Sequence, residues 1–252
     1  MNVATVDHPV RARLGSWPYD PSVAHLVLLD HHMVPETNDV SDWIRMAALK
    51  GATSLRTGAL FPASTQAFRE AGFHPVDTLT LLECNLEAPL PIALSTSRFT
   101  SRNATAKLTR APLRRLRFAD LSEAATIDRN AFDPPWNNDP DTLMEICKAT
   151  PHYRSRSVIE HGRMNAFAIS GRTSSWGYIQ RMAVEPLAQR RGLGRTLVID
   201  SLEWMLRRKV SRVMVNTATD NHGAIALYRS IGFEPRPEPL VILELSIDGR
   251  TQ

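Results

Sequence analysis

The segment Met182–Arg195 joins an apolar strand, a basic turn with two glycines and the start of an amphipathic helix. Such a turn directs several backbone N–H groups and the positive end of the helix dipole at one place. Gly192 and Gly194 would let a phosphate approach the backbone closely. The segment therefore predicts a site for a phosphorylated ligand. It is not a P-loop, because no Gly-Lys-Ser/Thr follows, and not a dinucleotide fingerprint, because Leu197 stands where the third glycine belongs.

A second segment makes the prediction from the first segment more specific. It is Asn221-x-x-Ala224-x-x-Leu227-Tyr228-x-x-x-Gly232-Phe233, and it follows Gln189-x-x-Gly192-x-Gly194 in order. At this point the sequence resembles the GCN5-related N-acetyltransferase (GNAT) superfamily, over about residues 113–247. The first motif matches the family's acyl-CoA pyrophosphate loop, and the second matches the motif that follows it.

The resemblance implies an α/β (α+β) fold with a mixed central sheet, splayed strands and flanking helices. The strand ending at Val184 and the strand at 212–217 would splay, and acetyl-CoA would lie between them. A backbone N–H near Val184 would stabilise the oxyanion, and Tyr228 would protonate the leaving thiolate. The residues expected to bind the cofactor are Met182, Ala183, Val184, Gln189, Arg190, Arg191, Gly192, Leu193, Gly194, Arg195, Thr196, Asn221 and Tyr228.

The general base is not evident. The inward positions of the strand ending at Val184 hold Tyr178 and Gln180, and neither is a good base. Glu160 is our candidate; His161, Asp133 or a water chain could serve instead, and an acceptor with a low pKa would need no dedicated base. The residues expected to contact the acceptor are Phe132, Asp133, Trp136, Tyr178 and Gln180.

Several of these residues also have a purely structural interpretation. Tyr228 could be a core aromatic, Asn221 could only cap a helix, and the arginines of the turn could be solvated charges. Cys84 and Cys147 are expected to be buried apolar side chains. No third ligand suitably spaced from His31 and His32 is present, so no metal site is predicted.

The elements that position these residues follow from hydrophobic periodicity and capping signals. Strands are expected at 113–118, 156–160, 165–170, 176–184, 212–217 and 240–247, and helices at 121–132, 141–149, 192–208 and 222–231.

The N-terminal part repeats the end of this series. Arg69, Gly72, Phe73 and Pro75 recur at a constant offset of 160 residues. We therefore predict a degenerate, partial GNAT-like domain at 1–86, a linker at 87–112 and a catalytic domain at 113–252. This layout resembles that of mycothiol synthase, in which a degenerate half precedes an active one. Phe68 occupies the position equivalent to Tyr228, so the N-terminal half should not catalyse.

Composition sets the remaining limits. The 252 residues carry a net charge of +4 and are 43% hydrophobic, which is typical of a soluble globular protein. No apolar run is long enough to span a membrane, and two cysteines fit a reducing, cytoplasmic location. We expect a monomer or homodimer that transfers an acetyl group from acetyl-CoA to a primary amine of a small molecule or protein. The alternatives are a non-catalytic acetyl-CoA sensor and, from the basicity alone, a nucleic-acid-binding module, for which the aromatic and basic pattern is missing.

Overall fold

The structure is a computed structural model that describes residues 4–5, 10–17, 20–29, 33–88 and 113–247. These residues form two compact units. Unit 1 comprises Met1–Leu81, Ala218–Asp220 and Arg236–Gln252, and unit 2 comprises Leu82–Thr217 and Asn221–Pro235. The predicted linker, 87–112, lies outside the described residues except at 87 and 88, and so does the pair His31 and His32.

Unit 1 is a sheet with helices packed on it, in the strand order β1-β2-β3-β4-β12-β5. Trp43 of α1 and Phe68 of α2 are fully buried in its core, where their rings stack at 5.9 Å between centroids. The elements are β1 (Ala4–Thr5), β2 (Ala12–Trp17), β3 (Asp20–Leu28), α1 (Thr37–Leu49), β4 (Ser54–Thr57), η1 (Pro62–Ser64), α2 (Thr65–Glu70), the first part of β5 (His74–Asn85) and β12 (Leu240–Ser246).

Unit 2 contains the end of β5 and continues with β10-β9-β8-β7-β6, while β11 pairs with the end of β5. Its elements are β6 (Leu113–Arg115), η2 (Phe118–Asp120), α4 (Leu121–Ala131), α5 (Pro140–Lys148), β7 (His152–Glu160), β8 (Arg163–Arg172), β9 (Trp176–Val184), η3 (Pro186–Ala188), α6 (Leu193–Leu206), β10 (Arg212–Ala218), α7 (His222–Arg229) and β11 (Glu234–Pro235).

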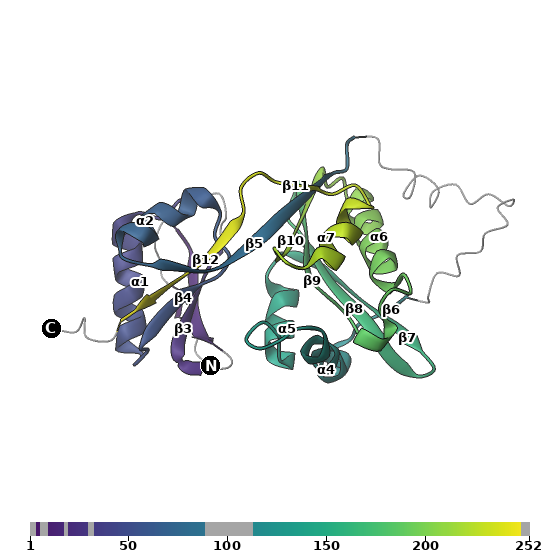
Figure 1. The fold of residues 1–252 in the computed structure, drawn as a ribbon, viewed down its shortest axis with the longest axis horizontal. Helices are drawn as coiled ribbons and strands as arrows, with labels where there is room; N and C mark the ends of the chain where they lie inside the picture. The colour runs from purple at the N-terminus through teal and green to yellow at the C-terminus, as the bar shows by residue number, and fades with distance from the viewer. Residues whose placement is uncertain (1–3, 6–9, 18–19, 30–32, 89–112, 248–252) are drawn as a thin grey trace, which may run out of the picture. The chain divides into compact units, whose positions relative to one another are not determined.

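Alternate residues of β8 show how the helices of unit 2 cover its sheet. Phe167 and Ile169 pack in the cluster with α4 and α5, whereas Ala166 and Ala168 pack against Leu197 of α6. Because side chains alternate along a strand, α4 and α5 lie on one face and α6 on the other (Figure 1). Val198, Leu202 and Met205 bury the apolar face of α6, and each such burial is worth about 1.5–3 kcal/mol.

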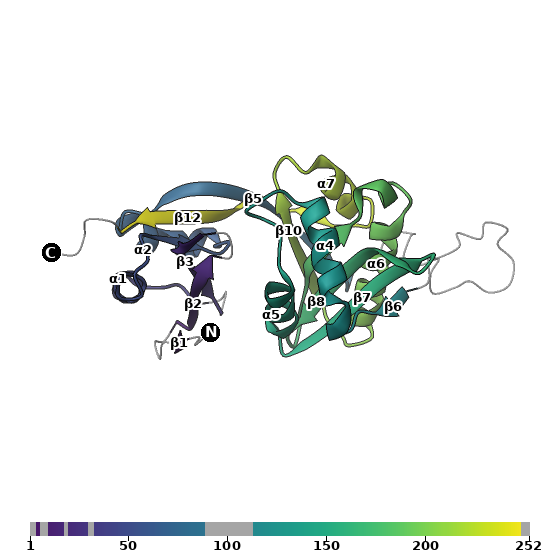
Figure 2. The ribbon, with the colours of Figure 1, turned by 90° about the horizontal axis from the view of Figure 1, so that it is seen from below.

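The predicted elements of unit 2 are present, with ends within a few residues of the expected ones. The predicted mixed sheet flanked by helices is confirmed. The division of the chain differs from the predicted boundaries at the C-terminus. Strand β12 pairs with β4 and β5 and belongs to unit 1 rather than to the domain predicted at 113–252 (Figures 1 and 2). Backbone pairing decides this, and the apolar pattern of a strand does not show which partner it will have.

The internal repeat is visible in the hydrogen bonds after α2 and α7. Phe73 N donates to Phe68 O at 3.0 Å, and Phe233 N donates to Tyr228 O at 3.1 Å. The intervening Gly72 and Gly232 both have positive φ, +95° and +109°. Both turns need the left-handed backbone that glycine adopts without strain, which explains why both glycines occur at the same offset.

Candidate active site in unit 2

Unit 2 contains a cavity of about 500 Å³ between β9, the start of α6 and α7. This volume lies in the range of small-molecule sites. Eleven of the predicted site residues line it: Phe132, Met182, Ala183, Val184, Gln189, Arg190, Gly192, Leu193, Gly194, Arg195 and Asn221.

The cavity lies beside strands that separate. The parallel pairing of β9 and β10 runs only from Trp176 opposite Arg212 to Tyr178 opposite Met214. Both strands continue, β9 to Val184, without further pairing to each other. The predicted splay is therefore present, and it leaves backbone groups of β9 free to pair with an extended ligand.

The start of α6 has no side-chain cap. Its N-cap is Gly192, which has a φ of +82° and no side chain to accept from the first turn. Arg190, two residues before Gly192, also has a positive φ of +61°. The first amides of a helix have no partner within the helix, so this terminus offers N–H donors and positive dipole charge to an anion.

Gly194 is required for a different reason. A Cβ built at this position would lie 3.2 Å from Leu227 Cδ2 and 3.7 Å from Met182 Cε. The α6 backbone thus approaches α7 and β9 closely at the cavity, and a side chain here would fill that space.

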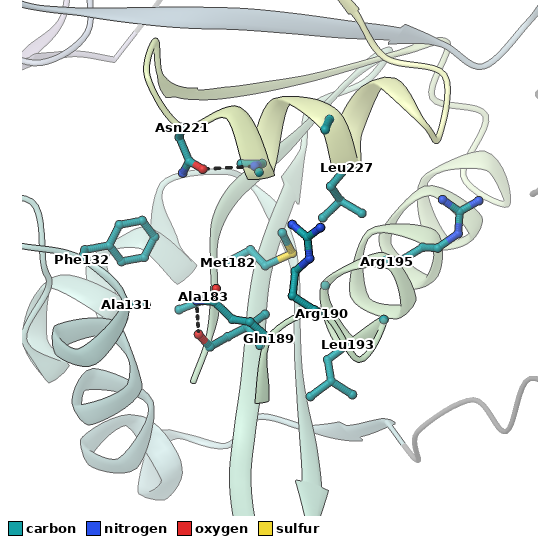
Figure 3. Close-up of a pocket in the computed structure, with 16 residues that line it drawn as sticks. Ala131, Phe132, Met182, Ala183, Gln189, Arg190, Leu193, Arg195, Asn221 and Leu227 are labelled. Atoms are coloured by element: carbon teal, nitrogen blue, oxygen red, sulfur yellow. Dashed lines mark hydrogen bonds between the residues drawn. The ribbon is translucent and has the colours of Figure 1, made fainter. Parts of the chain in front are cut away.

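Figure 3 shows two ends of this cavity. Phe132 and Asn221 lie at one end, and Arg190, Leu193 and Arg195 lie at the other. Asn221 caps α7, since its Oδ1 accepts from Ala224 N at 3.1 Å, as predicted. The arginine end suits a diphosphate, and the Phe132 end is apolar.

Tyr228 does not line the cavity, although the preceding Leu227 does. Its side chain is 5% exposed and lies against Phe233, with ring centroids 5.5 Å apart. Burial raises the pKa of the Tyr228 hydroxyl, and the positive charge of Arg181 acts in the opposite direction. The phenol is therefore protonated at neutral pH, and the same burial makes it a weaker acid than an exposed tyrosine.

Three predicted residues near the turn face elsewhere. Arg191 pairs with Glu160 at 2.9 Å, and Glu160 also accepts from Asn165 Nδ2 at 2.7 Å. Glu160 does not line the cavity, and its carboxylate is paired with Arg191, so the structure does not place it where an acceptor amine in the cavity could transfer a proton to it. Thr196 donates its hydroxyl to Gly192 O at 3.1 Å.

The predicted acceptor residues are dispersed as well. A bulge in β9, where Ile179 pairs with Ser170 and Arg181 with Ile169, breaks the strict alternation that had placed Gln180 and Tyr178 with Met182. Of the predicted acceptor residues, only Phe132 lines the cavity. Asp133 and Trp136 belong to the loop beyond it, where Trp136 N donates to Asp133 O at 2.9 Å.

The sequence analysis missed a buried ion pair beside this loop. Arg181 Nη2, on β9, lies 2.6 Å from Asp128 Oδ1, on α4, and Asp128 is 0% exposed. A signal was present: Asp128 lies on the helix face formed by Leu121, Ala124 and Ala125, and a charge on an apolar face needs a partner.

Comparison with known proteins agrees with this geometry. The sequence profile of the acetyltransferase (GNAT) family matches residues 121–233. The [ribosomal protein bS18]-alanine N-acetyltransferase of Escherichia coli K12 is 30% identical over 118 residues, which are 47% of this chain and 77% of that protein. The N-alpha-acetyltransferase RimI of Mycobacterium tuberculosis is 33% identical over 122 residues, 46% of this chain and 73% of that protein.

This chain belongs to the GNAT family. Its relatives are N-acetyltransferases, and the chain is an N-acetyltransferase of the same family. A solved tandem GNAT protein from the clavulanic acid biosynthesis pathway has the same fold, with a TM-score of 0.65 and 15% identity over 94% of this chain and 78% of that one. The tandem GNAT layout inferred from the repeat is therefore confirmed.

Unit 1, which the sequence predicts to be a degenerate GNAT-like copy, differs from unit 2 where the cavity lies. All four residues of β4 pair with β3, so these strands do not splay. The start of α1 carries two carboxylates, Glu36 and Asp39, and Asp39 Oδ2 accepts from Glu36 N at 2.9 Å. Negative charge at this helix start would repel a diphosphate.

The described residues contain neither a metal-binding cluster nor a membrane-spanning helix. Among them, no group of three or more His, Cys, Asp or Glu side chains could hold a metal ion. None of the helices in the described ranges is long and apolar enough to cross a bilayer.

Proposed function

We propose that this GNAT protein transfers the acetyl group of acetyl-CoA to the α-amine at the N-terminus of a peptide or protein. The observation that supports acetyl-CoA as the acetyl donor is the uncapped start of α6, with Arg190 and Arg195, at one end of the cavity. The diphosphate of CoA would accept from these amides, and the pantetheine would follow the unpaired part of β9.

Transfer is direct. The neutral amine attacks the thioester carbonyl, so a C–N bond forms and an oxyanion develops near the backbone N–H of Val184. The C–S bond then breaks, and the leaving thiolate takes a proton. Tyr228 is the proposed donor, although it does not line the cavity and only the adjacent Leu227 does. The amine releases its extra proton to water, and solvent reprotonates Tyr228.

The absence of a base among the lining residues supports an α-amine as the acceptor. Of the described residues that line the cavity, none is Asp, Glu or His. An α-amino group has a pKa near ~8, so a substantial fraction is neutral at neutral pH, whereas a lysine amine, with a pKa near ~10.4, is almost fully protonated. The relatives named for acetylation of the alanine of ribosomal protein bS18 support the same class.

The proposal also includes a cytoplasmic location. Both free cysteines, Cys84 and Cys147, are buried, which is compatible with a reducing compartment.

The test is mass spectrometry of a short peptide with N-terminal alanine and one internal lysine, incubated with acetyl-CoA. A second peptide is identical but blocked at its N-terminus. We expect acetylation of the first peptide at its α-amine and none of the second. A panel of other amines, including a polyamine and an aminoglycoside, is run beside them.

Two results would count against the proposal. Equal acetylation of the blocked peptide would assign the reaction to lysine side chains. Binding of acetyl-CoA without acetylation of any amine would favour the sensor alternative.

A further inference from the structure

The guanidinium of Arg181, on β9, donates three hydrogen bonds. Its Nε donates to Asp128 Oδ2 at 2.7 Å, and one terminal nitrogen donates to Asp128 Oδ1 at 2.6 Å. The same nitrogen donates to the backbone oxygen of Trp136 at 2.9 Å. One guanidinium thus binds α4 and the loop that follows it.

The carboxylate of Asp128 ties down the other end of this loop. Its Oδ1 accepts from Asn138 N at 2.7 Å and from Asn138 Nδ2 at 3.3 Å. Asp128 is fully buried, so each of these bonds replaces water that the charge has lost. The loop 132–138 is therefore held to a single buried ion pair.

Arg181 also contacts the cavity wall. Its guanidinium carbon lies 3.7 Å from the centre of the Phe132 ring, which is a cation–π contact. Phe132 lines the cavity at the end away from Arg190 and Arg195 (Figure 3). If the arginine end binds the diphosphate, the Phe132 end is where the acyl group and the acceptor meet.

We propose that Arg181 is a positioning residue that, paired with Asp128, holds Phe132 and the loop 132–138 in place for the acceptor amine. This inference rests on the proposed function. It assigns Arg181 no contact with substrate, because two of its three guanidinium nitrogens donate to Asp128 and to the Trp136 carbonyl.

Lysine cannot replace this arginine. An ammonium group is a point charge without the planar fork, so it cannot bind both carboxylate oxygens, donate to the Trp136 carbonyl and lie flat on the Phe132 ring at once. Arg181→Lys keeps the charge beside the buried Asp128 and loses the geometry.

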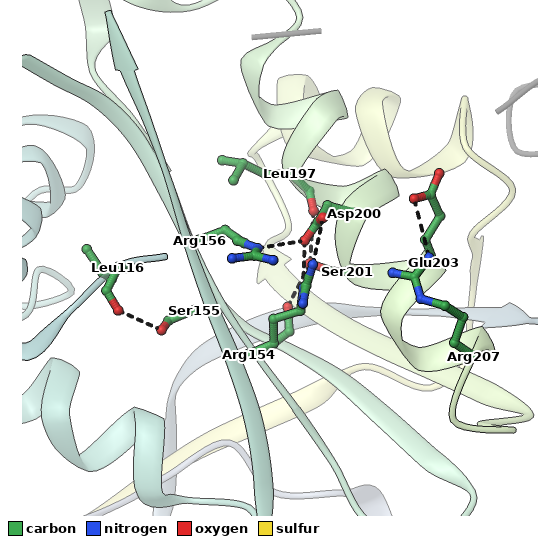
Figure 4. A network of polar contacts seen from close by, with 10 residues as sticks. Leu116, Arg154, Ser155, Arg156, Leu197, Asp200, Ser201, Glu203 and Arg207 are labelled. Atoms are coloured by element: carbon green, nitrogen blue, oxygen red, sulfur yellow. Dashed lines mark hydrogen bonds and ion pairs between the residues drawn. The ribbon is translucent and has the colours of Figure 1, made fainter. Parts of the chain in front are cut away.

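The structure contains a matched control. Arg154 binds Asp200 with the same two-point geometry, at 2.8 and 3.0 Å, between β7 and α6 of unit 2 (Figure 4). Neither residue lines the cavity. Asp200 Oδ2 also lies 3.4 Å from Arg156 Nε. Arg154→Lys therefore tests the loss of a two-point arginine–carboxylate pair away from the cavity, with a second arginine left beside the carboxylate.

The experiment compares full-length Arg181→Lys, Arg154→Lys and wild type. It measures the dissociation constant of acetyl-CoA by calorimetry, and kcat/KM for the amine that the wild type acetylates fastest in the panel above. We expect Arg181→Lys to lower kcat/KM at least tenfold while the dissociation constant stays within threefold. Arg154→Lys should leave both within twofold. Hydrogen exchange of the segment 132–138 should accelerate only in Arg181→Lys.

A double-mutant cycle separates positioning from a general loss of structure. Phe132→Leu should lower kcat/KM at least fivefold by itself. The kcat/KM of the double variant Arg181→Lys, Phe132→Leu should lie no more than twofold below that of the less active single variant, because both changes disturb the same group of contacting residues. If Arg181→Lys does not fold, Phe132→Leu still tests the wall that Arg181 supports.

Any of four results would overturn the inference. The first two concern Arg181→Lys: a kcat/KM within twofold of wild type, or equal losses of acetyl-CoA affinity and of turnover. The other two are a double variant whose loss of kcat/KM is the product of the single losses, and a Phe132→Leu variant with full activity. A wild type that acetylates no amine refutes the proposed function instead, so the two failures are distinguishable.

Discussion

Replacing Gly192 with aspartate should close the diphosphate site while leaving the fold intact. Gly192 is the N-cap of α6, and a Cβ built on it meets nothing within 4 Å. An aspartate here could accept from the free amides of the first turn, but an N-cap aspartate adds only about a few tenths of a kcal/mol over the N-cap glycine that it replaces. The left-handed backbone, with a φ of +82°, costs an L-residue about 1–2 kcal/mol, somewhat less for Asp or Asn. The strain is the larger effect, so the free energy of unfolding should fall by about 1 kcal/mol, which lowers the melting temperature by about 2–4 °C and leaves the protein folded.

The effect on binding is larger. A carboxylate roughly 5 Å from a phosphate costs about 2–3 kcal/mol per pair of negative charges at an effective dielectric constant of about 20–40. The acetyl-CoA dissociation constant should therefore rise at least ~30-fold. Gly192→Asp would reproduce at α6 the acidic helix start that unit 1 has at α1, with Glu36 and Asp39.

Gly192→Asn is the matched control, because it has the same shape, caps equally well and carries no charge. Isothermal titration of wild type, Asn and Asp variants separates the competition for amides from the charge repulsion. The acetyl-CoA dissociation constants of the Asn and Asp variants should differ less in 1 M salt, where charges are screened over about 3 Å. An Asp variant that binds acetyl-CoA within threefold of wild type would show that the diphosphate does not lie at the start of α6.

Three further predictions follow from the same structure. Tyr228→Phe should bind acetyl-CoA normally and lower kcat at least tenfold, and equal turnover by the two proteins would remove the phenol from the mechanism. Calorimetry should give one acetyl-CoA per chain, because the β3 and β4 strands of unit 1 do not splay; a stoichiometry of two would contradict this. Burial, with the charges of Arg13 and Arg56, lowers the pKa of His25 to about 4. The unfolded chain then binds a proton that the folded one does not, so the free energy of unfolding should fall by up to about 3 kcal/mol from above pH ~6.5 down toward pH 4. Urea denaturation at both ends of this range should show that fall in wild type and not in His25→Gln.

Local patterns were sufficient to predict α6, α7 and the turn between β9 and α6. Each depends on neighbours within a few residues: Gly192 at the cap, Asn221 at the next cap, and Gly232 at the end of α7. Periodicity likewise located β9 at its observed bounds. Such features survive in any fold, because they follow from backbone conformation and from hydrogen bonds between near neighbours.

Other features depend on residues that are far apart in the chain. Glu160 looked like a possible base until the structure paired it with Arg191. A single bulge in β9 moved Gln180 out of the expected register, and β12 joined the sheet of unit 1.

The sequence by itself indicated the family, and it predicted a helix start suited to an anion and a degenerate N-terminal half, since glycines, caps and the exchange of Tyr for Phe act locally. Only the tertiary structure decided that Arg181 and Asp128 meet beneath Phe132. Arg181 and Asp128 are 53 positions apart in the sequence, and no local sequence pattern specifies that they pair. A buried charge requires a partner, but which partner it finds depends on how helix α4 packs on strand β9.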